Sequence, residues 1–252
     1  MVKGLDCFRD HFNAYNDRYV LIGGAACSLA MDNAGLAFRA TRDLDIVLCV
    51  EALDTSFVKS FWDFIKAGGY QNKQQSTGRR LFYRFYSPED DTYPAMLELF
   101  SRTPDTLDVG KNSHLAPIPV DEELSSLSAI LLDETYYGFI HSGKREIEGL
   151  SVVGVEHLIP LKARAWLDML ERAAKGEKID SKDIRKHKND IFRLYQLLSA
   201  KPVPGIPDKI KADMNCFIER IANDGPVDLK SLGLRGTRLD KVLENVQMIY
   251  GL

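Results

Sequence analysis

The chain has 252 residues, of which 45% are hydrophobic and 27% are charged, and its formal net charge is −3. This length can bury a sizeable core as one large domain or two small ones, and the charge balance excludes a polycation that binds nucleic acid over its whole surface. The first residues, MVKGLDCFRDHF, lack the apolar core of a signal peptide, and no apolar run is long enough to span a bilayer. We therefore expect a soluble, cytoplasmic protein with no membrane partner.

The cysteines and histidines indicate neither a disulfide framework nor a zinc site. The four cysteines show no CxxC spacing, and the five histidines form no HExxH pattern. We expect reduced, buried thiols at Cys7, Cys27, Cys49 and Cys216.

A glycine pair interrupts the first apolar run of the chain. After an amphipathic segment at 5–15, the short apolar run 19–22 stops at Gly23-Gly24, and the small residues of 25–34 predict a helix that starts there. Glycine lets the backbone approach a ligand, and a helix N-terminus offers free N–H groups. The pair is a candidate phosphate site, although such a pair before a helix is often only a tight turn.

Two aspartates lie near the start of the next run, 41–50, which has the alternation of a strand. Side chains two apart on a strand share a face, so Asp43 and Asp45 lie together. The opposite face is apolar and consists of Leu44, Ile46, Leu48 and Val50. Two carboxylates beside a core need a cation, and Mg²⁺ held by oxygen ligands is the simplest candidate. A solvated turn or strand edge is the alternative.

A third carboxylate lies on another predicted strand. A helix over 53–67 carries an aromatic stripe that we expect to be core, and strands follow at 80–86 and 93–100. On the second strand Glu98 shares a face with Met96 and Phe100. A carboxylate among apolar residues costs stability unless it is paired or binds a metal. The alternative is an exposed glutamate on an edge strand.

The second half of the chain changes character and becomes almost wholly helical. We expect a helix over 124–132 and one or two short strands between Tyr136 and Val155. Four helices follow, over 155–175, 181–198, 208–223 and 237–250, the second of them with Ser181 as its N-cap. We therefore divide the chain into domains 1–150 and 151–252.

Basic residues gather in the first two of these helices. Lys162 lies near the start of one, and the first turns of the next are basic from Lys182 to Lys188. Within them Lys186 and Asp190 are four apart and share a helix face. An ammonium group suits the negative charges of a nucleoside triphosphate. A solvated basic helix end with an ordinary ion pair is the alternative.

In this order the motifs resemble the nucleotidyltransferase superfamily typified by DNA polymerase β, and within it the AbiEii-type toxin branch that includes the MenT-like toxins. The resemblance rests on Gly23-Gly24, a helix, the run Arg39-Ala40-Thr41-Arg42-Asp43-Leu44-Asp45, and then Lys162 and the segment 186–190. That branch carries a Lys-Asp-x-x-Asp-like motif in the last segment, where this chain has His187 in place of the first Asp. Ala25 stands where many of those toxins have a hydroxyl residue.

The resemblance implies an α+β fold, with a nucleotidyltransferase-fold N-terminal domain (a mixed sheet flanked by helices) and a helical C-terminal domain. It implies two Mg²⁺ ions as cofactors and a nucleoside triphosphate as substrate. The implied metal ligands are Asp43, Asp45 and Glu98; the implied catalytic residues are these three with Lys162 and Asp190; and the implied nucleotide-binding residues are Gly23, Gly24, Ser28, Arg42, Lys162 and Lys186.

The resemblance further implies transfer of a nucleoside monophosphate to a hydroxyl of RNA, often tRNA, or of a protein, by a toxin that has a cognate antitoxin. The basic cluster from Lys182 to Lys188 is the candidate contact with an RNA backbone. Two other functions stay open. One is transfer to a small molecule such as an antibiotic, with Glu89, Asp90 and Asp91 facing a cationic acceptor. The other is a non-catalytic module of the same fold that binds nucleotide or a partner protein.

Overall fold

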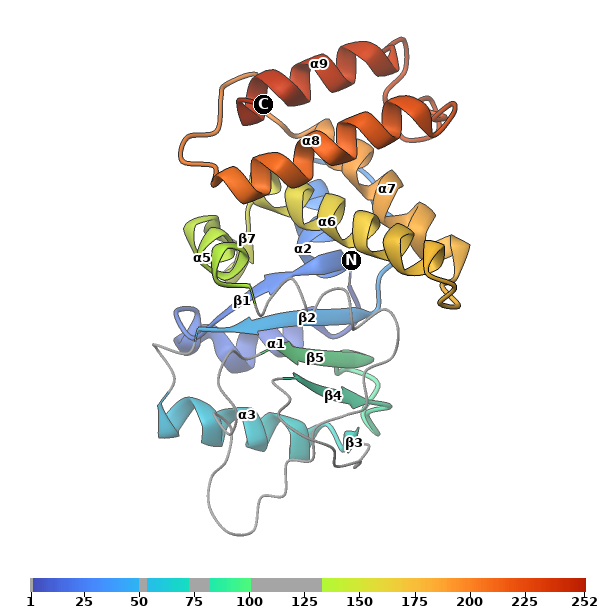
Figure 1. Cartoon of the computed structure of the whole chain (residues 1–252). Helices are drawn as coiled ribbons and strands as arrows, with labels where there is room; N and C mark the ends of the chain where they lie inside the picture. Colours follow the sequence, from blue (N-terminus) through green and yellow to red (C-terminus); the bar gives the residue numbers. More distant parts are fainter. Residues whose placement is uncertain (1, 50–53, 73–81, 101–132) are drawn as a thin grey trace. The chain divides into compact units, whose positions relative to one another are not determined.

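The computed structural model describes residues 2–49, 54–72, 82–100 and 133–252 of the chain (Figure 1). The described residues form two compact units. The first contains those up to residue 100 and also Lys144–Gly154, and the second contains 133–143 and Val155–Leu252. The domains 1–150 and 151–252 that the sequence suggested stay a prediction, because compact units of a structure are not by themselves domains that fold independently.

The first unit is built on a mixed sheet, whose strands in the described residues number seven and follow the order β3-β4-β5-β2-β1-β7-β6 (Figure 1). The bounds are β1 Tyr19–Ile22, β2 Asp43–Leu48, β3 Gln71–Asn72, β4 Phe82–Tyr86, β5 Met96–Phe100, β6 Lys144–Ile147 and β7 Leu150–Val153. β2 runs antiparallel to β1 and parallel to β5, while β4 is antiparallel to β5. β1 is parallel to β7, and the outer pairs β3–β4 and β6–β7 are antiparallel. The predicted α+β class, a mixed sheet with helices, is confirmed.

The described part of this unit contains three helices and one 3-10 turn: α1 Leu5–Phe12, η1 Asn13–Tyr15, α2 Gly23–Asn33 and α3 Thr55–Ala67. The ring of Phe12 on α1 contacts Phe57 and Phe61 on α3 and Tyr19 on β1. Phe61 also contacts Phe85 on β4, and all of these side chains are buried. The aromatic stripe of α3 is therefore core, as its helical spacing predicted.

The strand register separates an apolar from a polar face of β2. Residues paired across neighbouring strands point to the same side of a sheet. Tyr19 pairs with Leu48, so Leu48 and Ile46 face the aromatic cluster and are buried. Asp43 and Asp45 alternate with them and therefore face away from this cluster.

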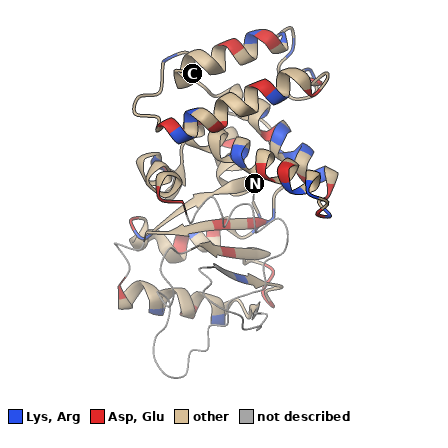
Figure 2. Ribbon diagram, in the orientation of Figure 1, with Lys and Arg blue, Asp and Glu red and all other residues tan. Residues whose placement is uncertain are grey.

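The second unit is helical in the described residues. Its bounds are α5 Glu134–Ser142, α6 Val155–Ala174, α7 Ser181–Tyr195, α8 Asp208–Asn223 and α9 Leu239–Tyr250. α6 packs against α7 and α8, and Trp166 of α6 meets Phe217 of α8 edge to face at 5.5 Å between ring centroids. Lys and Arg are frequent along α7 (Figure 2).

Helix α5 occupies the start of the 136–155 segment, for which the sequence predicted one or two short strands. Asp133 caps this helix by accepting hydrogen bonds from the backbone N–H groups of Thr135 and Tyr136. Tyr136, Tyr137, Phe139 and Ile140 then form a buried stripe at helical spacing. The two strands of the segment, β6 and β7, begin only after Gly143.

Several smaller predictions are settled by the same description. The cap of α7 is Asp180 rather than Ser181, because the Asp180 carboxylate accepts from the Lys182 N–H at 2.8 Å. None of the four cysteines, all of which the structure describes, forms a disulfide bond; Cys27 and Cys49 are buried and the other two are half-buried. The helix predicted over 124–132 lies outside the described residues. Of the helices that are described, none is at once long and apolar enough to cross a membrane.

Candidate active site

A row of polar residues crosses three neighbouring strands on the face of the sheet that points away from the aromatic cluster. Arg84 on β4 pairs with Glu98 on β5, and Glu98 pairs with Asp45 on β2. Asp45 in turn lies opposite Ile22, the last residue of β1. The strand order therefore brings an arginine and two carboxyl groups, far apart in the sequence, side by side.

Glu98 is the most deeply buried carboxyl group of this row. The residue is 8% exposed, and its Oε1 accepts from Nη2 and Nε of Arg84 at 2.9 and 3.0 Å. Across the strand pair it lies opposite Asp45. Burial, followed by the negative charge of Asp45, raises the pKa of Glu98 to about 9, although Arg84 acts in the opposite direction. Glu98 is therefore an interior residue, and the alternative of an exposed edge glutamate is wrong.

The glycine pair lies directly against this row. Gly23 has a φ of +63°, and a Cβ atom built on it would stand 1.7 Å from Oδ2 of Asp45. A Cβ atom on Gly24 would stand 2.5 Å from Oγ1 of Thr41 and 3.5 Å from Nη2 of Arg39. Gly23 therefore needs to be glycine, and a side chain at Gly24 would require Thr41 to shift.

Helix α2 begins at Gly23 without a side-chain cap. The residue before it, Ile22, has an apolar side chain that cannot accept from the N–H groups of the first helical turn. Such groups need a partner, and an anion is a suitable one because the helix dipole adds positive potential at this end. Gly23 and Gly24, which we call the glycine corner, thus place a helix N-terminus beside the carboxyl groups of Asp45 on β2 and Glu98 on β5.

The other predicted residues of the first unit lie around this corner with different surroundings. Asp43 is half-buried, pairs with Met96 and shares the face of Asp45. Ser28 is buried one turn further along α2, where its hydroxyl donates to Asp32 Oδ2 at 3.3 Å. Arg42 is exposed just before β2. Of the site residues predicted in this unit, Gly23, Asp45 and Glu98 are the ones whose positions next to one another are established.

Sequence reasoning missed two arginines of the site. Arg84 lies in a predicted strand and alternates with apolar neighbours, which places it on the polar face, but only the strand order identifies Glu98 as its partner. Arg39 belongs to the run that carries the family resemblance, and it is half-buried beside Gly24 with its guanidinium 5.2 Å from the Phe38 ring centroid. The position of Arg39 shortly before the Asp-x-Asp motif is the sequence feature that could have identified it as a site residue.

The donor set of the carboxyl pair fits a hard divalent cation. Asp45 and Glu98 offer only oxygen atoms, and Mg²⁺ is usually held by one or two carboxylates together with substrate phosphates. Within the described residues, no three or more His, Cys, Asp or Glu side chains are grouped so as to hold a metal ion. The predicted site of three carboxylates stays a prediction, and the observed pair is Asp45 with Glu98.

The remaining predicted residues belong to the helical unit. Nζ of Lys162 on α6 lies 3.3 Å from Oδ2 of Asp190 on α7, and these two residues are 5% and 0% exposed. Arg193 contacts the other oxygen of Asp190 at 3.4 Å. Lys186 lies 3.9 Å from Asp183, one turn earlier on its own helix. Asp190 thus has a close partner on another helix in Lys162, whereas the sequence spacing suggested Lys186.

The acidic cluster considered for a cationic acceptor is a surface turn. Asp91 is almost fully exposed and accepts from Lys3 at 2.6 Å. Asp90 accepts from the N–H and the hydroxyl of Thr92, and these bonds lower the pKa of Asp90. Asp90 therefore holds the local turn, and Asp91 forms a surface ion pair with Lys3.

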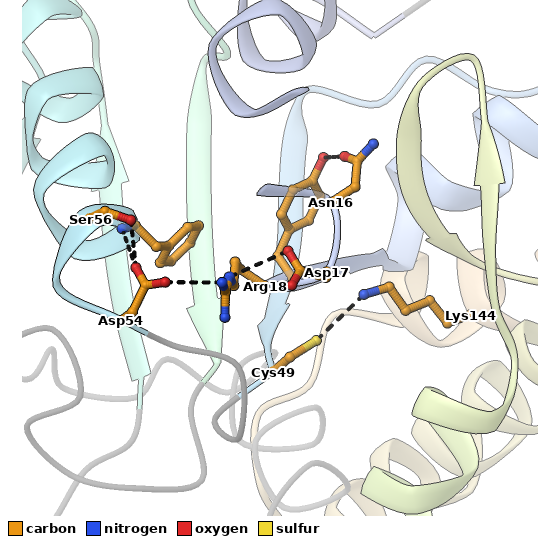
Figure 3. A network of polar contacts seen from close by, with 9 residues as sticks. Asn16, Asp17, Arg18, Cys49, Asp54, Ser56 and Lys144 are labelled. Carbon is orange, nitrogen blue, oxygen red and sulfur yellow. Dashed lines mark hydrogen bonds and ion pairs between the residues drawn. The ribbon is translucent and has the colours of Figure 1, made fainter. Parts of the chain in front are cut away.

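A second polar network lies at the other end of β1 and β2 (Figure 3). Arg18, just before β1, contacts Asp17 and Asp54 at 3.3 and 3.0 Å. Cys49, just after β2, has its sulfur 3.8 Å from Nζ of Lys144. Because Tyr19 pairs with Leu48 and Ile22 with Asp45, this network and the glycine corner terminate opposite ends of the same strand pair.

No family model matches the chain, and no curated protein matches its sequence. Among solved structures, the chain is similar to an antigenic nucleotidyltransferase-like protein from Paracoccidioides brasiliensis, with 14% identity, a TM-score of 0.47, and coverage of 98% of this chain and 94% of that chain. It is also similar to JHP933 from Helicobacter pylori, with 16% identity, a TM-score of 0.36, and coverage of 98% and 89%. At these TM-scores neither likeness bears on the function of this chain.

Proposed function

We propose that the chain is a nucleotidyltransferase, which moves a nucleoside monophosphate from a nucleoside triphosphate to an acceptor hydroxyl. The observation that carries the proposal is the meeting of Gly23, Asp45 and Glu98 at one corner of the sheet. A helix N-terminus that binds anions and adjacent carboxyl groups that bind a divalent cation are the two components of a phosphoryl-transfer site. The order of the sequence motifs supports the same function.

In this proposal Asp43, Asp45 and Glu98 hold Mg²⁺, with two ions as the family resemblance implies. Bound Mg²⁺ supplies charge neutralisation at the triphosphate and a lower pKa for the attacking hydroxyl. The backbone N–H groups of the first turn of α2 bind phosphate oxygens. Arg39, beside Gly24, adds positive charge on the same side. The roles of Lys162, Lys186 and Asp190 toward the nucleotide remain predictions, as do those of Ser28 and Arg42.

The proposed acceptor is RNA, with tRNA as the first candidate, and the proposed biological role is that of an AbiEii-like toxin with a cognate antitoxin. The feature that supports RNA is the basic helix α7, on which Lys182 and Arg185 are exposed. Side chains of this kind bind a phosphate backbone without regard to sequence. A protein hydroxyl is the other acceptor that the family resemblance implies.

A second candidate function is a module of the same fold that binds nucleotide without turnover. One observation favours it: Arg84 already pairs with Glu98, so the buried carboxyl group has a cationic partner without a metal ion. Small-molecule transfer lacks comparable support, because the acidic cluster of residues 89–91 is an exposed turn.

Pyrophosphate release separates the enzyme from the binding module. Purified protein is incubated with Mg²⁺, each of the four ribonucleoside triphosphates in turn, and total RNA, and radioactive nucleotide reports the labelled acceptor. We expect release that disappears in Asp45→Ala and Asp43→Ala and persists in Asp17→Ala, a surface aspartate of the same unit. Nucleotide binding without release by the wild-type protein would instead establish the module.

A further inference from the structure

Arg84 is the charged member of the polar row that the proposed reaction does not use. Its side chain is 18% exposed and both of its contacts to Glu98 end on the same oxygen, Oε1. Glu98 in turn lies opposite Asp45 across β5 and β2. Since β4, β5 and β2 are adjacent and in register at these three residues, the arginine lies directly behind the carboxyl group that meets Asp45.

We propose that Arg84 is a positioning residue, which fixes the Glu98 carboxyl group so that Glu98 and Asp45 can bind one divalent cation together. The biological meaning of this role rests on the proposed function, whereas the role itself is tested by measuring the affinity for a cation. Arg84 would not touch the cation itself; it would act only through Glu98.

The planar guanidinium group is suited to this role. Two N–H donors converge on Oε1 and hold this oxygen from two directions, whereas a lysine would supply one mobile point charge. The side chain of Glu98 has three rotatable bonds and a buried site, so its orientation depends on such a partner. Groups that orient metal ligands in this way typically contribute 10-fold to 100-fold to metal affinity.

The competing explanation is that the Arg84–Glu98 pair only stabilises the sheet. A purely structural pair would leave cation affinity unchanged in any variant that still folds. A positioning pair would lower the affinity even when the fold is intact, and the loss would depend on the presence of Glu98.

Mn²⁺ is the probe, because it replaces Mg²⁺ at oxygen sites and its free concentration is read directly by electron paramagnetic resonance. The titration uses the full chain without nucleotide, and circular dichroism and the thermal midpoint check the fold of each variant. For Arg84→Met we expect affinity about 10-fold weaker or more, and for Arg84→Lys an intermediate loss. Arg18→Met is the matched control, since it removes an arginine–carboxylate pair at the other end of β1 and should leave affinity within about twofold of wild type.

A double-mutant cycle tests whether Arg84 acts through Glu98. In a Glu98→Gln background, adding Arg84→Met should cause no further loss of Mn²⁺ affinity. This double variant leaves neither charge of the Arg84–Glu98 pair buried without the other, so it stays informative if Arg84→Met alone fails to fold. A full additional loss in that background would overturn the proposal.

The proposal is also overturned by wild-type affinity in Arg84→Met or by a wild-type protein that binds no Mn²⁺ at millimolar concentration. Its failure is distinct from failure of the proposed function. Mn²⁺ binding could depend on Arg84 while no combination of nucleotide and acceptor releases pyrophosphate. That result would support the positioning role and contradict nucleotidyl transfer.

Discussion

Gly23 lies so close to Asp45 that a Cβ atom on the glycine would stand 1.7 Å from the carboxylate oxygen Oδ2. The glycine also has a φ of +63°, which L residues rarely adopt. The carboxylate of β2 and the first turn of α2 are therefore in contact through a position where no side chain fits. This contact joins the two parts of the proposed site, the carboxyl pair and the helix N-terminus.

Replacing Gly23 by Ala should disrupt both the fold near the site and the proposed activity. The variant suffers backbone strain and a clash with Asp45, and it displaces a proposed ligand. We expect it to lose more than the ~1–2 kcal/mol of strain alone and to release pyrophosphate at least about 100-fold more slowly. Urea denaturation and the pyrophosphate assay measure the two effects.

Gly35→Ala is the matched control, because Gly35 has a φ of +69° just after the same helix but nothing within 4 Å of its Cβ position. It carries the strain without the clash, so it should lose ~1–2 kcal/mol and keep its activity. Equal losses of stability in both variants, with full activity in Gly23→Ala, would contradict a role for the Gly23–Asp45 contact.

Local patterns were sufficient to predict much of this corner. Strand alternation placed Asp43 and Asp45 on one face opposite the apolar side chains of β2, and the strand register confirms it. The glycine pair predicted the start of α2. The family resemblance implied that Glu98 binds metal together with Asp43 and Asp45, and Glu98 lies opposite Asp45 on the neighbouring strand. Their shared role in metal binding remains untested.

What the sequence could not supply was the choice of partners. Arg84 alternates correctly, but its contact with Glu98 follows from the strand order β4-β5-β2, which no local pattern encodes. In the same way, Lys186 is the sequence neighbour of Asp190, yet Lys162 of another helix is its buried partner. Helix α5 was missed because its aromatic residues suit strands as well as helices, and the cap at Asp133 decides between them.

The Lys162–Asp190 pair should contribute to the stability of the helical unit. Removing one partner leaves the other charge buried, so Lys162→Met should lower the free energy of unfolding by about 3 kcal/mol. Asp190→Leu should lower it at least as much, since both Lys162 and Arg193 lose a partner. The double variant leaves neither of the two charges buried and should be more stable than the sum of the single losses predicts. If the losses measured by urea denaturation are strictly additive, Lys162 and Asp190 do not stabilise each other.

Asp54 provides a pH-dependent contribution from the N-cap of α3. The hydrogen bond from the Phe57 N–H, then that from Ser56, lowers the pKa of Asp54 from its ordinary value of 3.8, and Arg18 acts in the same direction (Figure 3). Because the folded form holds the proton less tightly, the unfolded chain binds more protons in acid. The contribution is thus fully present above the ordinary pKa and is lost as the pH falls below it.

Asp54→Asn keeps a capping oxygen but cannot titrate. Its thermal midpoint should lie below that of wild type at neutral pH, and the difference should shrink as the pH falls through the range below 3.8. Thermal denaturation followed by circular dichroism at several pH values measures this. A difference that stays constant down to strong acid would show that the Asp54 charge contributes nothing.

The proposal of an RNA acceptor predicts binding that weakens with salt and depends on α7. Lys182 and Arg185 are exposed on this helix, and each phosphate contact adds about 0.7–0.9 to the slope of log affinity against log salt. A Lys182→Gln/Arg185→Gln variant should therefore bind tRNA more weakly and show a slope smaller by about 1.5. Lys241→Gln, an exposed lysine of α9 that pairs with Glu244, is the control and should bind like wild type. Native gels with tRNA over a range of salt concentrations give both quantities. If the double variant and the wild type bind tRNA equally at every salt concentration, α7 is not the RNA contact; if neither binds, the acceptor is not tRNA.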